Sequence, residues 1–357
     1  MASVEVGLVG LPNCGKSTVF NALTGGGAAV APHMFSTVES NHGIAEVRDV
    51  RLHDLARLSS SAKVVPATLQ VVDIAGLVRG ASHGEGLGNQ FLGHIRTTDA
   101  VLHVLRCFRD ETVAHPSGVV DPLEDAETVE LELAFADLAT IERRAERVAK
   151  GVKAGDRDAV AERDVLETLR AELEAGRPAR AAGVERPATV DLLTAKPTLY
   201  VANVDESGDA DEVAVLERFA ADHGSRCLAL NAKIEAELRE LPEEDAAGFL
   251  SELGIERPAL DRITLAAYAQ LDLIPFFTTG PKETRAWTIR RGQNAQAAAG
   301  RIHTDLARGF IRAEVIEWDR LLEAGSEAEA KRRGWVRVEG RDYVVKDGDV
   351  LNVRFNV

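Results

Sequence analysis

Short apolar runs alternate with helical patterns along the first 110 residues of the chain and again after residue 197. A helix is predicted to start at Ser17–Leu23, and five runs have the length and β-branched content of strands: Val4–Val9, Thr68–Ile74, Ala100–Cys107, Thr198–Asn203 and Cys227–Leu230. Because these runs are apolar throughout, the strands are expected to be buried on both faces. The pattern predicts an α/β fold with a parallel-rich sheet between helices.

Between Asp121 and Lys196 the strand pattern stops, and apolar residues recur at helical spacing. One series ends at Val152, and a second runs from Val160 to Leu173. A two-helix hairpin, or short coiled coil, is therefore predicted as an insertion at about residues 122–195. The pattern fits a solvated helix pair as well as an arm that docks on a partner.

After about residue 272 the pattern changes to short strands around one helix, Ala295–Gly309. The predicted strands are Ala286–Arg290, Glu314–Trp318, Trp335–Val338, Tyr343–Lys346 and Val350–Phe355. Residues 346–349 are expected to form a turn between the last two. The chain is therefore divided into an α/β domain, residues 1–275, and a small α+β domain, residues 272–357.

Composition narrows the class of protein. The 357 residues suffice for a hydrophobic core, and Cys14, Cys107 and Cys227 are too few and too scattered for a disulfide framework. No apolar run reaches the ~18 residues of a membrane span, and no signal peptide is evident, so a cytoplasmic location is expected. The net charge of −15 argues against nucleic-acid binding through bulk charge. Residues 281–357, with 15 Lys and Arg against 12 Asp and Glu, could still contact phosphate locally.

The strongest chemical signal is the run from Gly10 to Ser17, GLPNCGKS, between a predicted strand and a predicted helix. It matches the phosphate-binding loop G-x-x-x-x-G-K-[ST]. Backbone N–H groups of such a loop surround the phosphates, Lys16 reaches the β- and γ-phosphates, and Ser17 offers its hydroxyl to Mg²⁺. The loop predicts a P-loop NTPase.

A second signal, Asp73-Ile-Ala-Gly76, ends an apolar strand. Asp73 is expected to hold Mg²⁺, in general through water, and the Gly76 N–H to contact the γ-phosphate. Thr37 is the candidate for a second Mg²⁺-binding hydroxyl. The glycine-rich segment 77–91 that follows is typical of a switch.

The base-reading segment departs from the guanine pattern N-K-x-D. Here the strand ends Asn203-Val204-Asp205-Glu206, so the lysine is Val204 and the aspartate is the longer Glu206. The carboxylate that would accept two guanine N–H groups is lost or displaced, which favours ATP over GTP. Asn203 and the Val204 backbone could serve the adenine edge. Asn231-Ala-Lys233 lies where a base-capping loop is expected.

The residue after D-x-x-G is Leu77, where signalling GTPases have the glutamine that positions the attacking water. Hydrolysis is therefore expected to be slow, or another group orients the water. The candidates are His83, Asn89, Gln90, His94 and His115.

Together these residues resemble the Obg-like ATPases of the YchF type, over essentially the whole chain. The resemblance rests on segments 10–18, 73–92, 203–206, 285–289, 298–316 and 342–357. It implies a translation-factor-class G domain with a coiled-coil insertion, a C-terminal TGS domain of the β-grasp type, slow hydrolysis of ATP, and association with the ribosome and with stress responses.

By motif match, the resemblance implies phosphate binding by residues 13–18, which are Asn13, Cys14, Gly15, Lys16, Ser17 and Thr18. It also implies Mg²⁺ binding by Ser17 and Thr37, and adenine contacts from Asn203 and Val204. The family's proposed catalytic histidine corresponds to His115. Asn13 fits either a K⁺ ion beside the phosphates, as in some related NTPases, or a hydrogen bond that stabilises the loop.

The expected function is that of a monomeric, cytoplasmic, Mg²⁺-dependent ATPase that acts on ribosomes, with Lys16 and His115 as catalytic residues and Glu206 in the base site. Two alternatives stay open: an Obg-group GTPase, and a nucleotide-gated ribosome-binding module whose hydrolysis is incidental.

Overall fold

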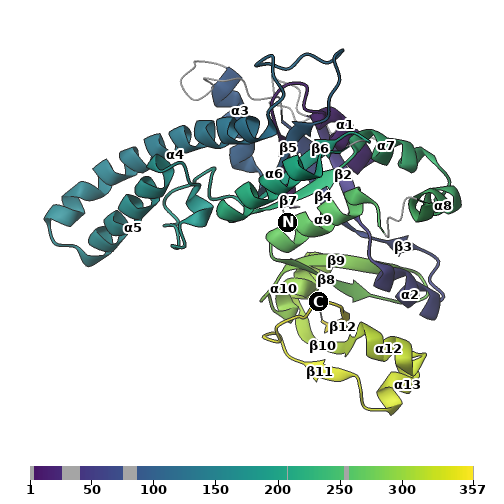
Figure 1. The fold of residues 1–357 in the computed structure, drawn as a ribbon. Coiled ribbons are helices and arrows are strands. Elements are labelled where there is room, and N and C mark those ends of the chain that lie inside the picture. The colour runs from purple at the N-terminus through teal and green to yellow at the C-terminus, as the bar shows by residue number, and fades with distance from the viewer. Residues whose placement is uncertain (1–3, 26–40, 75–86, 207, 253–256, 357) are drawn as a thin grey trace. The chain divides into compact units, whose positions relative to one another are not determined.

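The computed structural model describes residues 4–25, 41–74, 87–206, 208–252 and 257–356 (Figure 1). Contacts divide these residues into two compact units. The N-terminal unit comprises 4–44 and 70–263, and the C-terminal unit comprises 45–69 and 264–357. Among the helices so described, none is long and apolar enough to cross a membrane.

The N-terminal unit is built on a six-stranded sheet of order β2-β4-β1-β5-β6-β7. Neighbouring strands from β4 to β7 pair in parallel. The strands are β1 (Glu5–Val9), β2 (Asn41–Val47), β4 (Ala67–Asp73), β5 (Ala100–Cys107), β6 (Thr198–Val204) and β7 (Arg226–Leu230). The division between the units falls within β2 and β4, at residues 44–45 and 69–70. The five predicted strands are confirmed, and the parallel-rich sheet with them. The sixth, β2, was missed.

Every residue of β5 is buried, as the apolar pattern predicted for a strand covered on both faces. On the face that Val101, Leu105 and Cys107 share, one buried cluster joins β1, β4 and β5 to α3 and α4, and another joins β5, β6 and β7 to α4 and α6. The helices are α1 (Lys16–Thr24), α3 (Leu87–Thr97), α4 (Pro122–Lys153), α5 (Arg157–Glu174), α6 (Ala210–Asp222), α7 (Ala232–Glu240), α8 (Glu243–Glu252) and α9 (Ala259–Gln270).

The predicted helical hairpin is confirmed as an arm formed by α4 and α5, which extends well beyond the sheet of its unit (Figure 1). Asp121 caps α4 by accepting bonds from the N–H groups of Leu123 and Glu124. The 32 residues of α4 span about 48 Å. Arg144 on α4 binds both carboxylate oxygens of Glu162 on α5, at 2.7 and 2.8 Å.

A buried charged cluster ties the base of the arm to the sheet. Glu130 on α4 accepts a 2.6 Å bond from Arg180, which lies in the 3₁₀ turn Ala179–Ala181. Tyr200 on β6 donates to Glu130 and accepts from Arg180. His103 on β5 lies beside Tyr200, and the centroids of their two rings are 5.4 Å apart. Removing one member of such a cluster would leave another buried polar group without its partner, which is costly.

The C-terminal unit has its own six-stranded sheet, of order β11-β10-β12-β8-β9-β3. Its core includes Phe276, Ile289, Val315 and Leu351. The strands are β3 (Val64–Val65), β8 (Leu273–Thr278), β9 (Thr284–Arg290), β10 (Phe310–Glu317), β11 (Arg337–Glu339) and β12 (Asp349–Phe355). The helices are α2 (Val50–Leu58), α10 (Ala295–Ile302), α11 (Thr304–Arg308), α12 (Trp318–Ala324) and α13 (Glu327–Arg332).

Residues 45–69 pack with a part of the chain that follows more than 190 residues later, which the sequence pattern did not indicate. Arg51 on α2 pairs with Asp347 at 2.8 Å, and its guanidinium lies over the rings of Phe277 and Trp318. Strand β3 pairs in parallel with β9. The contacts are long-range, so no local pattern of residues could reveal them.

Two predicted elements of the C-terminal region are wrong. Residues 343–346 do not form a strand. The Tyr343 carbonyl accepts from the Ala295 N–H at the start of α10, the Val345 N–H donates to the Gln293 carbonyl, and an isolated bridge joins Val344 to Asn294. The predicted helix 295–309 is two helices, α10 and α11. It breaks at His303, which adopts an extended conformation and caps α11 with its own side chain.

The buried His103 predicts a pH dependence of stability. Burial lowers the pKa of His103 to about 4, with a smaller lowering by Arg180 and an opposing effect of Glu130. An unfolded histidine takes up its proton near pH 6.5, so the free energy of unfolding should fall from about pH 6.5 to about pH 4, by at most about 1.4 kcal/mol per pH unit. Urea unfolding of the wild type and of His103→Gln should show a smaller acid loss in the variant. Equal losses in both would contradict the prediction.

Candidate functional site

The predicted phosphate-binding loop connects β1 to α1, and its backbone requires glycine at Gly10, where a Cβ atom would lie 2.5 Å from the Val104 carbonyl oxygen, and at Gly15. Gly15 has a φ of 88°, directly before α1 begins at Lys16. A Cβ atom at Gly15 would lie 2.2 Å from Nδ2 of Asn203, so no side chain fits there. The loop therefore places the N-terminus of α1 beside Asn203 at the carboxyl end of β6.

Lys16, Ser17 and Asp73, three of the predicted phosphate and Mg²⁺ contacts, meet at the carboxyl ends of β1 and β4. Nζ of Lys16 lies 2.6 Å from Oδ1 of Asp73, and Oγ of Ser17 donates to Oδ2 at 3.3 Å. Both charged side chains are largely buried. The ammonium thus faces the carboxylate, and an incoming triphosphate would have to draw Lys16 from Asp73.

The Ser17 hydroxyl and the Asp73 carboxylate suit Mg²⁺, which prefers oxygen ligands. Within the described ranges no group of three or more His, Cys, Asp or Glu side chains could hold a metal ion by itself. The other predicted phosphate and Mg²⁺ contacts, Gly76 and Thr37, lie outside the described residues.

A cavity of about 620 Å³ opens beside the phosphate-binding loop. Gly15 and Thr18 form one side, and the remaining walls are 108–110 after β5, 203–206 after β6 and 231–233 after β7. Its position, at the carboxyl ends of parallel strands, is where α/β sheets bind ligands. The volume lies within the range of about 300–1,000 Å³ typical of small-molecule sites.

Three of the candidate base-site residues, Asn203, Val204 and Glu206, line this cavity, and so does the segment 231–233. Phe108, Arg109 and Asp110 also line it, and the sequence analysis missed them. Their position directly after the buried strand Ala100–Cys107 was the available signal, because ligand-binding loops follow such strands.

Asn203 connects the phosphate-binding loop to the start of α7. Its amide Nδ2 donates to the Cys14 carbonyl at 3.1 Å, and its Oδ1 accepts from the Ala232 N–H at 3.2 Å. The side chain is 5% exposed. Asn203 therefore positions two walls of the cavity, and its predicted contact with adenine stays a prediction.

The two carboxylates after Asn203 differ in their surroundings. Asp205 accepts a 3.0 Å bond from the Arg109 N–H and a 3.2 Å bond from the Gly208 N–H, so it holds the loop after β5 against the end of β6. Glu206 lines the cavity and is exposed. Both residues line the cavity, and the placement of Glu206 in the base site stays a prediction.

Cys14 is a packing residue of the phosphate-binding loop. Its side chain is 2% exposed, and burial raises the pKa of the thiol to about 11, against a smaller lowering by Lys16. The group therefore stays a neutral thiol near neutral pH and has little reactivity as a nucleophile.

Buried Arg106 joins the cavity wall to the segment that carries His115. Its guanidinium donates to the carbonyls of Phe108, Asp110 and Ala114, at 3.4, 3.0 and 3.4 Å. The Ala114 carbonyl also accepts a 2.9 Å bond from Nδ2 of Asn13 in the phosphate-binding loop. A single carbonyl thus links the phosphate-binding loop to the residue before the candidate catalytic histidine.

His115 is held by bonds at both ring nitrogens. Nε2 lies 3.0 Å from Oδ2 of Asp125 on α4, and Nδ1 lies 2.9 Å from Oγ of Ser117. The side chain is 4% exposed, and burial raises the pKa of Asp125, against the opposing effect of His115. To act on a water molecule, the ring would have to exchange one of these partners.

The other candidates for orienting the attacking water are His83, Asn89, Gln90 and His94, and the structure describes them only in part. His83 lies outside the described residues, as does Leu77, and the side chains of Asn89 and Gln90 on α3 are also outside the description. His94 is on α3, and its carbonyl accepts a bond from Thr97 Oγ1.

Two family models match the sequence. One, described as a 50S ribosome-binding GTPase, matches residues 5–141. The other, for the C-terminal part of YchF-type GTPases and described as a protein of unknown function, matches residues 273–356.

Full-length relatives are also similar. The chain is 47% identical to the ribosome-binding ATPase YchF of Bacillus subtilis, over 99% of this chain and 100% of the relative. It is 47% identical to the protein of the same name in Escherichia coli O157:H7, over 99% of both chains. Among solved structures, the Schizosaccharomyces pombe YchF GTPase covers 99% of this chain and 98% of its own, with 30% identity and a TM-score of 0.85.

The bridging position of Asn203 predicts how its loss affects binding. In Asn203→Ala, the Cys14 carbonyl and the Ala232 N–H lose a buried partner, so the Kd values of ATP and GTP should rise by a similar factor, roughly tenfold. Calorimetric titration with each nucleotide measures this, and Asn21→Ala, at an exposed position of α1, is the control. A loss confined to ATP would instead assign Asn203 to reading adenine.

Proposed function

Because this chain belongs to the family of YchF-type P-loop NTPases, we propose that it binds ATP with Mg²⁺, hydrolyses it slowly and associates with ribosomes. The observation that carries the proposal is the meeting of Lys16, Ser17 and Asp73 beside the cavity at the carboxyl ends of β5, β6 and β7. Because ribosomes are the proposed partner, the proposed location is the cytoplasm. The proposed active form is a monomer.

In this proposal the phosphates lie against residues 13–18, and Lys16 moves from Asp73 to the β- and γ-phosphates. Ser17 and Asp73 would hold Mg²⁺, with Thr37 as the second hydroxyl. The ion, when bound, neutralises charge that develops on the phosphate oxygens. The N–H groups at the start of α1 and of Gly76 supply further stabilisation of that charge.

Asn13 limits how a K⁺ ion could take part. Its Nδ2 is bonded to the Ala114 carbonyl, and this fixes the plane of the amide. K⁺ takes oxygen ligands, so the amide oxygen of Asn13 is the side-chain atom that would ligate it. K⁺ is proposed as an accessory ion, with the phosphates as its other ligands.

The preference for ATP is tested by comparing nucleotides. With Mg²⁺ present, ATP should bind more tightly than GTP, because neither Val204 nor Glu206 reproduces the guanine-binding lysine and aspartate. Calorimetry with both nucleotides measures the ratio, and Lys16→Ala should abolish tight binding of either triphosphate. Tighter GTP binding would favour the Obg-group GTPase, with Asn231–Lys233 as the place to search for guanine contacts. If Lys16→Ala still bound a triphosphate tightly, the assignment of residues 10–17 as the phosphate-binding loop would be wrong.

The role of His115 is tested by its effect on turnover. His115→Ala should lower kcat by roughly a hundredfold with little change in ATP affinity, as expected when a group that orients or deprotonates water is lost. Single-turnover hydrolysis gives the rate, and His53→Ala, at an exposed position on α2, is the control. Unchanged turnover would remove His115 from the mechanism, and a joint loss of affinity and thermal stability would assign it a structural role.

Co-sedimentation with ribosomes distinguishes the proposed ATPase from a ribosome-binding module whose hydrolysis is incidental. With a non-hydrolysable ATP analogue, a protein that needs its hydrolytic cycle should stay bound to ribosomes, whereas ATP should allow release. Equal release with both nucleotides would favour the module.

A further inference from the structure

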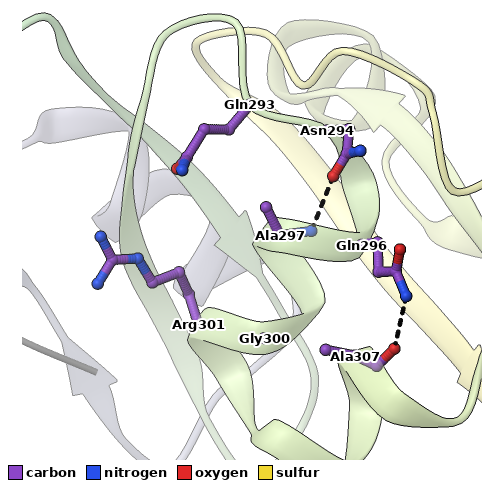
Figure 2. Close-up of a pocket in the computed structure, with 7 residues that line it drawn as sticks. All are labelled: Gln293, Asn294, Gln296, Ala297, Gly300, Arg301 and Ala307. Carbon is purple, nitrogen blue, oxygen red and sulfur yellow. Dashed lines mark hydrogen bonds between the residues drawn. The ribbon is translucent and has the colours of Figure 1, made fainter.

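Amide side chains line a cavity of about 540 Å³ in the C-terminal unit, and two of them serve the fold (Figure 2). Asn294 caps α10 at the Ala297 N–H, and Gln296 donates to the Ala307 carbonyl on α11. The polar groups around His115 in the N-terminal unit differ from these, because one partner of the ring has a second acceptor beside it.

That partner is the Ser117 hydroxyl, which lies between two acceptors. Its Oγ is 2.9 Å from Nδ1 of His115 and 2.8 Å from the Val119 carbonyl oxygen. A hydroxyl has one hydrogen, so it donates to one of these atoms at a time. It can donate to Nδ1 when the ring is neutral, and to Val119 when Nδ1 needs no donor. The bond at Nδ1 is therefore the one that the ring can exchange.

The Ser117 N–H group identifies the tautomer of the neutral ring. This group donates to Nδ1 of His115 at 3.3 Å, and because a backbone N–H can only donate, Nδ1 carries the lone pair. The ring proton is then on Nε2, where Oδ2 of Asp125 accepts it at 3.0 Å. This tautomer makes Nδ1 the nitrogen that can take up a second proton.

Asp125 is well placed to hold this tautomer. Its side chain is 8% exposed and lies in the first turn of α4, where the positive end of the helix dipole favours a charged carboxylate. The buried pair of Glu130 with Arg180 holds α4 about 8 Å further along. A carboxylate bonded to one nitrogen of an imidazole orients the ring and stabilises it when the other nitrogen is protonated.

The segment that carries His115 is bonded to the phosphate-binding loop. Ala114, the residue before His115, accepts a 2.9 Å bond from Asn13 of that loop through its carbonyl. The ring is therefore attached, through one residue, to the loop against which the phosphates are proposed to lie.

We propose that Asp125 is a positioning residue for ATP hydrolysis: it keeps the proton of the neutral His115 ring on Nε2, so that Nδ1 can exchange Ser117 for the attacking water. The inference rests on the proposed ATPase activity and on the role of His115 in it. Nδ1 takes a proton from the water while the water oxygen bonds to the γ-phosphorus. The bond from this phosphorus to the oxygen that bridges to the β-phosphate breaks, and its electron pair leaves with ADP. The ring then returns its proton to the phosphate product.

Kinetics of the full-length protein test the role of Asp125. In Asp125→Asn the amide can present its NH₂ group to Nε2 and favour the other tautomer, so kcat should fall roughly tenfold to a hundredfold while the Kd of ATP changes less than about twofold. Asp125→Glu keeps a carboxylate and should recover part of the rate. The matched control is Glu127→Gln, which removes one charge from an exposed position of the same helix. Single-turnover hydrolysis and calorimetry give the two constants.

A double variant shows whether Asp125 acts through the ring. His115→Ala combined with Asp125→Asn should hydrolyse ATP no more slowly than His115→Ala alone, because without the ring the carboxylate has nothing to position. If the two losses multiply, Asp125 acts independently of His115 and the inference is wrong.

NMR of the protein labelled with ¹⁵N-histidine examines the tautomer without any measurement of activity. Two-bond ¹⁵N–¹H spectra, with the His115 signal assigned by its absence from His115→Ala, should show the proton of the neutral ring on Nε2. Asp125→Asn should move part of the population to Nδ1. A wild-type proton on Nδ1 would overturn the inference, and this measurement decides it even if Asp125→Asn does not fold.

The remaining outcomes separate the inference from the proposed function. Normal turnover in Asp125→Asn, together with slow turnover in His115→Ala, would overturn the inference and leave the ATPase proposal in place. A joint loss of ATP affinity and thermal stability in both Asp125 variants would instead assign this carboxylate to the fold. If the wild type hydrolyses no ATP, the proposed function fails and the inference fails with it.

Discussion

The nucleotide site depends on the buried amide of Asn203, which joins three segments that are distant in the sequence. One amide group at the end of β6 bonds to the phosphate-binding loop after β1 and to the first turn of α7 after β7. Because both ends of the amide are used and the side chain is buried, the relative position of these loops is set before any ligand arrives. Preorganisation of this kind reduces the cost of binding.

A second layer of fixed contacts surrounds this amide. The Arg106 guanidinium donates hydrogen bonds to three carbonyls of the segment after β5. One of these carbonyls, on Ala114, also accepts a bond from Asn13 of the phosphate-binding loop. The base cavity, the phosphate-binding loop and the neighbourhood of His115 are thus parts of one hydrogen-bonded network.

Local signals predicted the sheet of the N-terminal unit and the arm, because apolar runs and helical spacing are properties of neighbouring residues. The phosphate-binding loop and its meeting with Asp73 followed from a motif with a known geometry. The membership of 45–69 in the C-terminal unit could not be predicted, since it depends on Arg51 meeting Asp347 across nearly 300 residues. The positioning role of Asn203 was not predicted, for the same reason. Its partners, Cys14 and Ala232, become neighbours only in the folded chain.

The long helix α4 has a mechanical consequence. Asp125, the partner of His115, lies near its start, and the buried pair of Glu130 with Arg180 holds it about one turn further along. Asp137, about two turns beyond Glu130, accepts bonds from the N–H groups of Leu193 and Thr194, so α4 is held at two buried points about 10 Å apart. About 24 Å of α4 lies beyond Asp137. A sideways push at the tip is therefore opposed at two points, and the carboxylate that holds His115 is shielded from bending of the arm.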